Sequence, residues 1–204
     1  QALTTGVNNV LMGYQAGDSI TTSNNNVAIG TTALATTSTS AGNNTAIGHA
    51  AMLNNTTGQN NVAVGLNSLA SNTTASNNVA IGYEALASNT TATNNVAIGY
   101  QAGRAITTGA QNTIIGLTAG DAITTASDNT VLGQSALGEN ITASGNTAIG
   151  KSALNSGSGG ENNVAVGKDA LFNAGARSAN TAVGHNSGSA ITSGDNNTIL
   201  GRFN

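Results

Sequence analysis

The residues that could take part in catalysis are few and lie far apart in this chain. The two histidines, His49 and His185, are the natural candidates for proton transfer or metal binding, and they stand in the first and last quarters of the sequence. The eight acidic residues are scattered, and the absence of cysteine excludes disulfides and thiolate metal sites. No nucleophile elbow, phosphate-binding loop or dinucleotide fingerprint occurs. We therefore expect a protein that is not an enzyme and needs no metal or cofactor.

Side chains that could bind a partner follow a recurring glycine. Tyr83 and Tyr100 occupy this position one repeat apart, and so do Lys151 and Lys168. Stacked tyrosines could hold the face of a sugar, and neighbouring lysines could contact a receptor. The same four residues could equally be ordinary exposed surface. The position after the glycine is the most variable of the repeat, as expected for contacts carried on a regular scaffold.

The element that places these side chains is a repeat of 17 residues. The recurring glycines, here called the column glycines, are Gly13, Gly30, Gly48, Gly65, Gly82, Gly99, Gly116, Gly133, Gly150, Gly167, Gly184 and Gly201. All steps between them are 17 residues except the step from Gly30 to Gly48, which is 18. Asn always stands four residues before the glycine, Val or Thr three before, and an aliphatic residue or Met one before. A fixed period of this kind is typical of a solenoid.

The unit is too short for a pair of helices. Its β-branched run, "NVAIG", alternates with turn-rich "SNTT", which predicts short strands separated by turns. We predict an all-β protein, a parallel β-solenoid of about twelve coils, as a single repeat domain over residues 1–204. Because the sequence starts and ends within the pattern, we expect it to belong to a longer fibre.

Two invariant positions predict a structural ladder, represented in the middle of the chain by Asn78, Asn95 and Asn112 and by Gly82, Gly99 and Gly116. Stacked asparagines could hydrogen-bond the coils above and below, and could adopt a left-handed turn conformation before the strand. The glycines indicate a positive φ angle or a position where a β carbon would clash with the next coil.

At two positions of the repeat, large and small residues change places from one type of coil to the other. The residue four after the glycine is Leu or Met in seven coils, and Ala then stands two before the next glycine, as in the pair Leu86 and Ala97. Four coils carry Gly instead, and in three of them the later residue is larger, as in the pair Gly103 and Ile114; Ala28 is the exception. Residues that share one cavity must compensate each other in this way, so this position faces an interior.

The neighbouring positions then point to the other face of the strand. One residue before each glycine stands an unbroken column of Ile, Val, Leu or Met, for example Ile81 and Ile98. A column of that kind is not expected to face water along a whole rod. We therefore predict that the second face is buried against other copies of the chain.

Composition excludes several classes of partner. Charged residues make up 6% of the chain and the formal net charge is −3, so no basic surface for nucleic acid is expected. No apolar run approaches the ~20 residues of a membrane-spanning helix, so we expect no membrane insertion by this segment.

The stretches "NNVAIGYEAL", "NTAIGHAAM" and "NNVAVGKDAL" resemble the head repeats of YadA-like trimeric autotransporter adhesins. They are equally similar to related repeats of phage tail fibres. The resemblance implies a left-handed parallel β-roll assembled as a homotrimer, and an extracellular structural or adhesive fibre on a virion tail or a bacterial surface. It also implies a cell-surface glycan or protein receptor as the partner. The 17-residue period and the Asn-Asn opening differ from the shorter adhesin units and favour the fibre relatives.

A threonine row offers a different function. The residues nine before the glycine are threonine in eight consecutive coils: Thr4, Thr21, Thr39, Thr56, Thr73, Thr90, Thr107 and Thr124. Regular threonine arrays on β-solenoids bind ice, which makes ice binding the alternative hypothesis. The structural alternative is a ladder in which the hydroxyl groups exchange hydrogen bonds at a turn.

Overall fold

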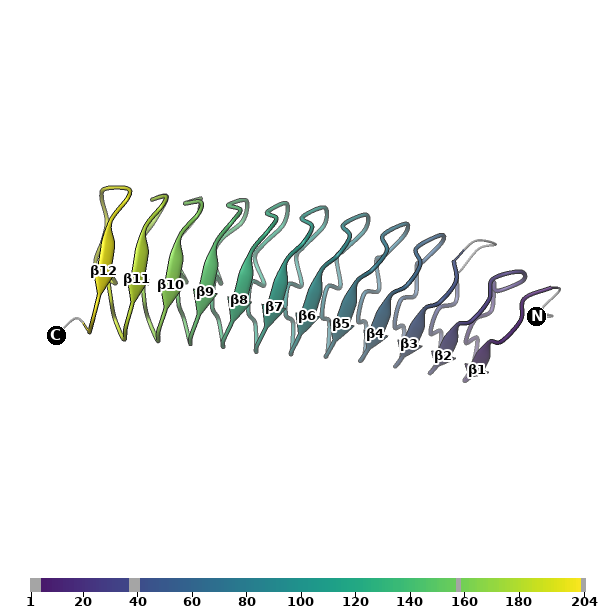
Figure 1. Ribbon diagram of the computed structural model, residues 1–204. Coiled ribbons are helices and arrows are strands. Elements are labelled where there is room, and N and C mark those ends of the chain that lie inside the picture. The colour runs from purple at the N-terminus through teal and green to yellow at the C-terminus, as the bar shows by residue number, and fades with distance from the viewer. Residues whose placement is uncertain (1–4, 37–40, 157–158, 203–204) are drawn as a thin grey trace.

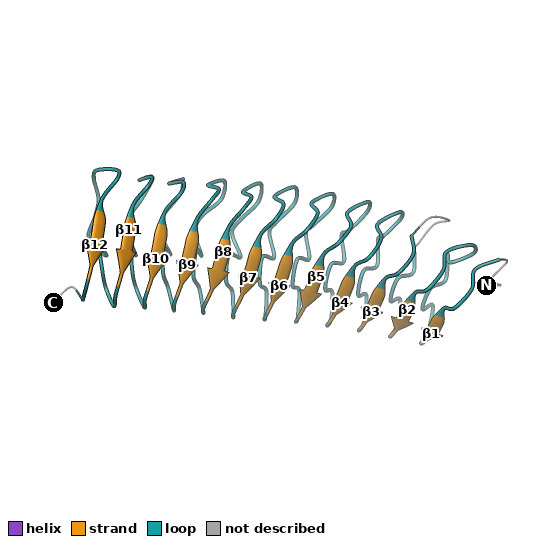
Figure 2. Ribbon diagram, in the orientation of Figure 1, coloured by secondary structure: helices purple, strands orange, loops and turns teal. Residues whose placement is uncertain are grey.

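The computed structural model describes residues 5–36, 41–156 and 159–202. In these residues the chain winds as a β-solenoid, and each coil contributes one short strand to a single parallel sheet (Figure 1). The sheet order follows the sequence from β1 to β12, and no helix occurs in the described residues (Figure 2). The predicted all-β class and parallel solenoid are therefore confirmed.

The strands have three residues each and end one residue before a column glycine. They are β1 Val10–Met12, β2 Val27–Ile29, β3 Thr45–Ile47, β4 Val62–Val64, β5 Val79–Ile81, β6 Val96–Ile98, β7 Thr113–Ile115, β8 Thr130–Leu132, β9 Thr147–Ile149, β10 Val164–Val166, β11 Thr181–Val183 and β12 Thr198–Leu200. Equivalent residues pair in register, for example Val96 with Thr113 and Ala97 with Ile114. The 18-residue step leaves this register intact, because Ala28 still pairs with Ala46.

The column glycines meet both of the conditions predicted for them. Gly99 has a φ angle of 138°, which side-chain-bearing residues rarely adopt. A β carbon built on Gly99 would also lie 2.7 Å from the carbonyl carbon of Gly116 in the next coil. The coils can therefore approach at this corner only where the side chain is absent.

The invariant asparagines form a continuous ladder inside the solenoid. Asn95 is fully buried, and its backbone N–H donates to Oδ1 of Asn78 at 2.9 Å. Its own Oδ1 accepts the backbone N–H of Asn112 at 2.9 Å and the side-chain Nδ2 of Asn112 at 3.1 Å. Nδ2 of Asn95 donates to the carbonyl of Gly109 at 2.9 Å. Each asparagine thus joins the coil before it and the coil after it.

The left-handed turn conformation belongs to the preceding residue and not to the ladder asparagine. Asn94 has a φ angle of 62° and is exposed, whereas Asn95 lies within the ladder. The assignment of this turn to the invariant asparagine was therefore wrong. An exposed Asn tolerates the left-handed region well, and Gln111 and Asp128 take the same place in later coils.

The core confirms the compensation of sizes. Leu86, Ala97, Ile106 and Ile114 are fully buried. A β carbon on Gly103 would stand 3.1 Å from Cδ1 of Ile114 and 3.2 Å from Cδ1 of Ile106, so these isoleucines fill the space that a leucine occupies in other coils.

The exception at Ala28 has a simple packing reason. The space beside Gly17 is filled by Leu11, whose Cδ2 would lie 2.6 Å from a β carbon at that position, and by Ile20. Leu11 belongs to the same coil as Gly17, not to the next one. The residue four after the column glycine therefore lies between two strands. A large residue on either strand is sufficient to fill the space beside it, so Ala28 can stay small.

Four of the coils with Leu or Met four residues after the column glycine carry a buried asparagine three residues further on: Asn55, Asn72, Asn89 and Asn140, whereas Ala174 takes this place after Leu171. Asn89 is fully buried; its Oδ1 accepts the backbone N–H of Ala92 at 3.1 Å and its Nδ2 donates to the carbonyl of Ala92 at 3.0 Å. In coils with Gly this position is Ile, as at Ile106, whose side chain reaches toward the vacant space. The two coil types thus differ at three coupled positions.

Candidate functional site

The row of residues that follow the column glycines, here called the post-glycine row, runs along the corner where each strand ends. Its members are Tyr14, Thr31, His49, Leu66, Tyr83, Tyr100, Leu117, Gln134, Lys151, Lys168, His185 and Arg202. All are exposed except His185, which is half-buried. Because the coils repeat in register, these side chains form one line parallel to the solenoid axis.

Tyr83 and Tyr100 stack on each other in the middle of this row. Their ring centroids are 5.0 Å apart and the ring planes differ by 10°. The two tyrosine residues are 39% and 47% exposed, so the pair lies at the surface. Leu66 and Leu117 stand on either side along the row and are also exposed. The four residues make an apolar segment of the row.

Polar side chains support the tyrosine pair on one side. Gln101 donates from Nε2 to Oε2 of Glu84 at 2.8 Å, and this hydrogen bond lowers the pKa of Glu84. A hydrogen bond between Tyr83 and Glu84 raises the pKa of the tyrosine, and the negative charge of Glu84 adds to the effect. In the next coil but one, burial raises the pKa of Asp121, against the opposing charge of Arg104. The hydrogen bond holds the side chains of Glu84 and Gln101 together beside the tyrosine pair.

Lys151 and Lys168 lie one coil apart, as predicted, and both are exposed. Nζ of Lys168 is 3.4 Å from Oδ2 of Asp169, and Lys151 makes no ion pair with any residue that the structure describes. Two further cationic or polar donors continue the same line, His185 and Arg202. The repeat places both residues in this row, although only the two lysines were predicted as contacts.

The threonine row has a hydrogen-bonded role. The hydroxyl of Thr73 donates to the carbonyl of Thr90 at 3.0 Å, and the hydroxyl of Thr90 donates to the carbonyl of Thr107 at 3.2 Å. These threonines are half-buried, and Thr4 and Thr39 lie outside the described residues. The exposed threonines are the next residues along the chain, namely Thr57, Thr74, Thr91, Thr108, Thr125 and Thr142. The doublet "TT" in the sequence was the signal for this second row.

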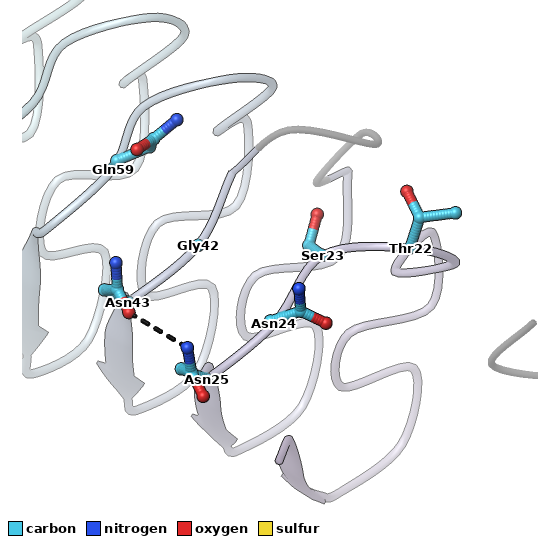
Figure 3. Close-up of a pocket in the computed structure, with 7 residues that line it drawn as sticks. All are labelled: Thr22, Ser23, Asn24, Asn25, Gly42, Asn43 and Gln59. Atoms are coloured by element: carbon cyan, nitrogen blue, oxygen red, sulfur yellow. Dashed lines mark hydrogen bonds between the residues drawn. The ribbon is translucent and has the colours of Figure 1, made fainter. Parts of the chain in front are cut away.

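A polar hollow lies ahead of strands β2 and β3, where the repeat is one residue longer (Figure 3). It is lined by Thr22, Ser23, Asn24, Asn25, Gly42, Asn43 and Gln59. Among the lining residues, Nδ2 of Asn25 donates to Oδ1 of Asn43 at 3.2 Å, as the dashed line shows. Gly42 has no side chain where the next coils carry Gln59 and Ser76, and a β carbon there would lie 3.1 Å from the carbonyl oxygen of Asn24. The lining carries no ionisable side chain and so no group that could transfer a proton.

Within the described ranges, no three His, Cys, Asp or Glu side chains lie close enough together to hold a metal ion. No helix of a length and apolarity suited to crossing a membrane is found among the same residues.

Comparison with known proteins adds no relative. No family model matches the chain, and neither a curated protein nor a solved structure does.

Proposed function

We propose that this chain is a non-enzymatic segment of an extracellular fibre, in which three copies assemble side by side as a left-handed parallel β-roll. The segment acts as a rigid spacer, and its post-glycine row contacts a receptor on a cell surface. The fibre is a phage tail fibre or a bacterial surface adhesin. The resemblance of "NNVAIGYEAL" and its copies to the repeats of such fibres supports this proposal.

The observation that carries the proposal is the contrast between the two faces of the sheet. On the inner face, Ala80 and Ala97 are fully buried. On the outer face, Ile47 and Ile81 remain 37% exposed, and Leu132 remains 46% exposed. These residues lie in register along twelve strands, which makes one long apolar strip on a single chain. Soluble monomers rarely expose a continuous apolar surface of this extent.

A homotrimer explains why the strip is continuous. A partner that repeats with the same period covers every coil in the same way, and a second and third copy of this chain have that period by construction. Each coil contributes Val or Thr at the start of its strand and Ile, Val, Leu or Met at its end. Burial of about 25 cal/mol per Å² of apolar surface, repeated over all coils, favours assembly strongly.

The proposal is tested by the mass of the purified segment in solution. Light scattering should give three times the chain mass of 19.8 kDa at all concentrations where the protein is folded. A folded species of one chain mass would refute the assembly. A dimer would keep the argument from the apolar strip and remove the support from the fibre resemblance.

Ice binding remains a second candidate because of the exposed threonine row. Thr74, Thr91 and Thr108 repeat at the coil spacing of about 4.8 Å and are solvent-exposed. Their hydroxyls have no hydrogen-bond partner in the part of the chain that the structure describes. Thermal hysteresis of the purified segment, compared with a variant carrying Thr91→Val and Thr108→Val, tests this candidate.

A further inference from the structure

The basic side chains of this protein are not spread evenly over the solenoid. Of the five Lys and Arg residues, Lys151, Lys168 and Arg202 belong to the post-glycine row. With His185 they occupy four consecutive coils, and we call these four residues the basic segment of the row. The lower edge of the ribbon in Figure 1, where strands β9 to β12 end, is the corner that carries them.

Placing cations one above another costs stability. Like charges on neighbouring strands repel each other, and the coil spacing of about 4.8 Å brings the attachment points close together. The repulsion is relieved at one place only among the described residues, where Lys168 lies 3.4 Å from Asp169. A chain with 6% charged residues could avoid this arrangement easily. The basic segment is therefore better explained by a partner than by the needs of the fold.

The other two arginines, in contrast, interact with neighbouring residues of the chain. Nε and Nη2 of Arg177 both donate to the carbonyl of Thr192 at 3.1 Å, so that side chain is used within the fold. Arg104 stands by itself among the coils before Lys151 and acts on Asp121 and Glu84. Neither belongs to the row, and together they provide a control for net charge.

We propose that the basic segment binds a linear acidic polysaccharide, a polymer with a carboxylate or sulfate group on its repeating sugars, laid parallel to the solenoid axis. A straight line of donors with a fixed period is complementary to a polymer whose anionic groups also repeat. The apolar segment around Tyr83 and Tyr100 lies on the same line and offers ring surface to neighbouring sugars.

Two other polyanions fit the observations less well. Single-stranded nucleic acids are bound by cations interleaved with aromatic rings on which the bases stack, whereas Phe172 is the one aromatic residue described between Lys151 and Arg202, and it lies off the row. An anionic membrane is attracted by clusters of four to eight Lys or Arg on a surface, whereas this row is one residue wide with three permanent cations. We therefore favour the polysaccharide.

The inference rests on the proposed function in one respect, since the row must remain on the outside of the assembly. Binding and molecular mass are therefore measured on the same samples. The probe is dextran sulfate, with unsulfated dextran of equal length as the neutral control. Oligothymidylate of matched charge represents nucleic acid.

The decisive comparison uses two double variants with the same change in net charge. Lys151→Gln with Lys168→Gln removes two cations from the row, and Arg104→Gln with Arg177→Gln removes two from elsewhere. We expect the row variant to weaken binding of dextran sulfate at least about tenfold, and the control to stay within about twofold of the unmodified protein. Equal losses in both variants would overturn the proposal, because binding would then follow net charge alone.

Two variants that each add one lysine test the proposal without the risk that weaker binding merely reflects a loss of folding. Gln134→Lys extends the basic segment by one coil, whereas Gln111→Lys adds the same charge off the row; both glutamines are exposed. We expect Gln134→Lys alone to tighten binding and to steepen its dependence on salt. A trimer that does not bind dextran sulfate, or that binds oligothymidylate more tightly, would overturn the inference and leave the proposed function standing. A species of one chain mass would instead count against the proposed function.

Discussion

Cδ1 of Ile114 lies 3.1 Å from the position that a β carbon on Gly103 would take, so the two residues share one space inside the solenoid. They come from successive coils, and one residue is small where the other is large. Leu86 and Ala97 form the reversed pair one coil earlier, and both are fully buried. The alternation of coil types is therefore explained by packing in the core.

The packing rule predicts energetic coupling between Leu86 and Ala97. Ala97→Ile alone should overpack the core and cost about 1–3 kcal/mol of unfolding free energy. Leu86→Gly alone should leave a cavity and cost about 2–5 kcal/mol. The double variant should lose less than the sum of the two, because the new isoleucine enters the space that the leucine has left. Chemical denaturation of the four proteins in a double-mutant cycle measures the coupling, and strict additivity would show that the residues do not share a space.

The backbone conformation at Leu86 should lower the cost of the Leu86→Gly change, which makes compensation in the double variant easier than the sequence indicates. Leu86 has a φ angle of 51°, in the left-handed region, where a residue with a β carbon is strained by about 1–2 kcal/mol. Glycine relieves that strain, so part of the cost of the cavity is offset. Adding Asn89→Ile should recover more packing but also break the two hydrogen bonds to Ala92, so we expect a smaller gain from this third change.

The ladder predicts different outcomes for two adjacent asparagines. Asn95→Ala should cost about 1–3 kcal/mol for each buried group that it leaves unpaired, such as the backbone N–H of Asn112. Asn94→Gly should have little effect, because Asn94 is exposed with a φ angle of 62°, which glycine adopts without strain. Melting temperatures of the two variants check the prediction. A larger loss for the Asn94 variant would contradict the assignment of the ladder.

The outer face predicts a difference between Ile98 and Tyr100. Ile98→Asp places a carboxylate in the apolar strip and should cost several kcal/mol per chain if the strip is buried in an assembly. Tyr100→Asp removes the ring stacked on Tyr83 and should cost about 0.5–1.5 kcal/mol. Thermal unfolding and molecular mass should be recorded for both variants. If the two melt at the same temperature, the outer face of the strand is not an interface.

The contact between Tyr83 and Glu84 predicts a pH effect at the alkaline side. The pKa of Tyr83 is raised in the folded state, so this contact stabilises the fold below the ordinary tyrosine pKa of 10.0 and the stabilisation is lost as pH rises through the folded pKa. Glu84→Gln removes the negative charge and should lower the pKa of Tyr83 toward 10.0. Ultraviolet titration of tyrosine ionisation detects the change when the variant is compared with the unmodified protein. Unchanged titration curves would contradict the contact.

Much of the fold could be predicted because the repeat averages out local uncertainty. Twelve copies of one pattern place the strands, the column glycines and the inward-facing Ala97 and Ile114. The left-handed residue could not be placed, since both Asn94 and Asn95 suit that conformation and only the hydrogen bonds of the ladder decide between them. The small residue at Ala28 could not be explained from the sequence. Leu11 fills the space beside Gly17 from the same coil, whereas the size rule compares residues of successive coils.

The candidate site was predicted less completely than the fold. The stacking of Tyr83 on Tyr100 follows from the repeat, but the support from Glu84 and Gln101 depends on side-chain conformations that a sequence pattern does not specify. For the threonine row the sequence left two interpretations open, an exposed array and a hydrogen-bonded ladder, and the hydroxyl groups agree with the ladder. Those of Thr73 and Thr90 reach the carbonyls of the next coil, and the following residue of each doublet is the one exposed to solvent.

The central claim is that the outer strip is covered by two further copies of this chain. Multi-angle light scattering of the purified segment, with circular dichroism to show that it is folded, tests this most directly. We predict three times 19.8 kDa for the unmodified protein and loss of both the trimer and the fold for Ile98→Asp. A stable folded species of 19.8 kDa, with its apolar strip open to water, would contradict the account.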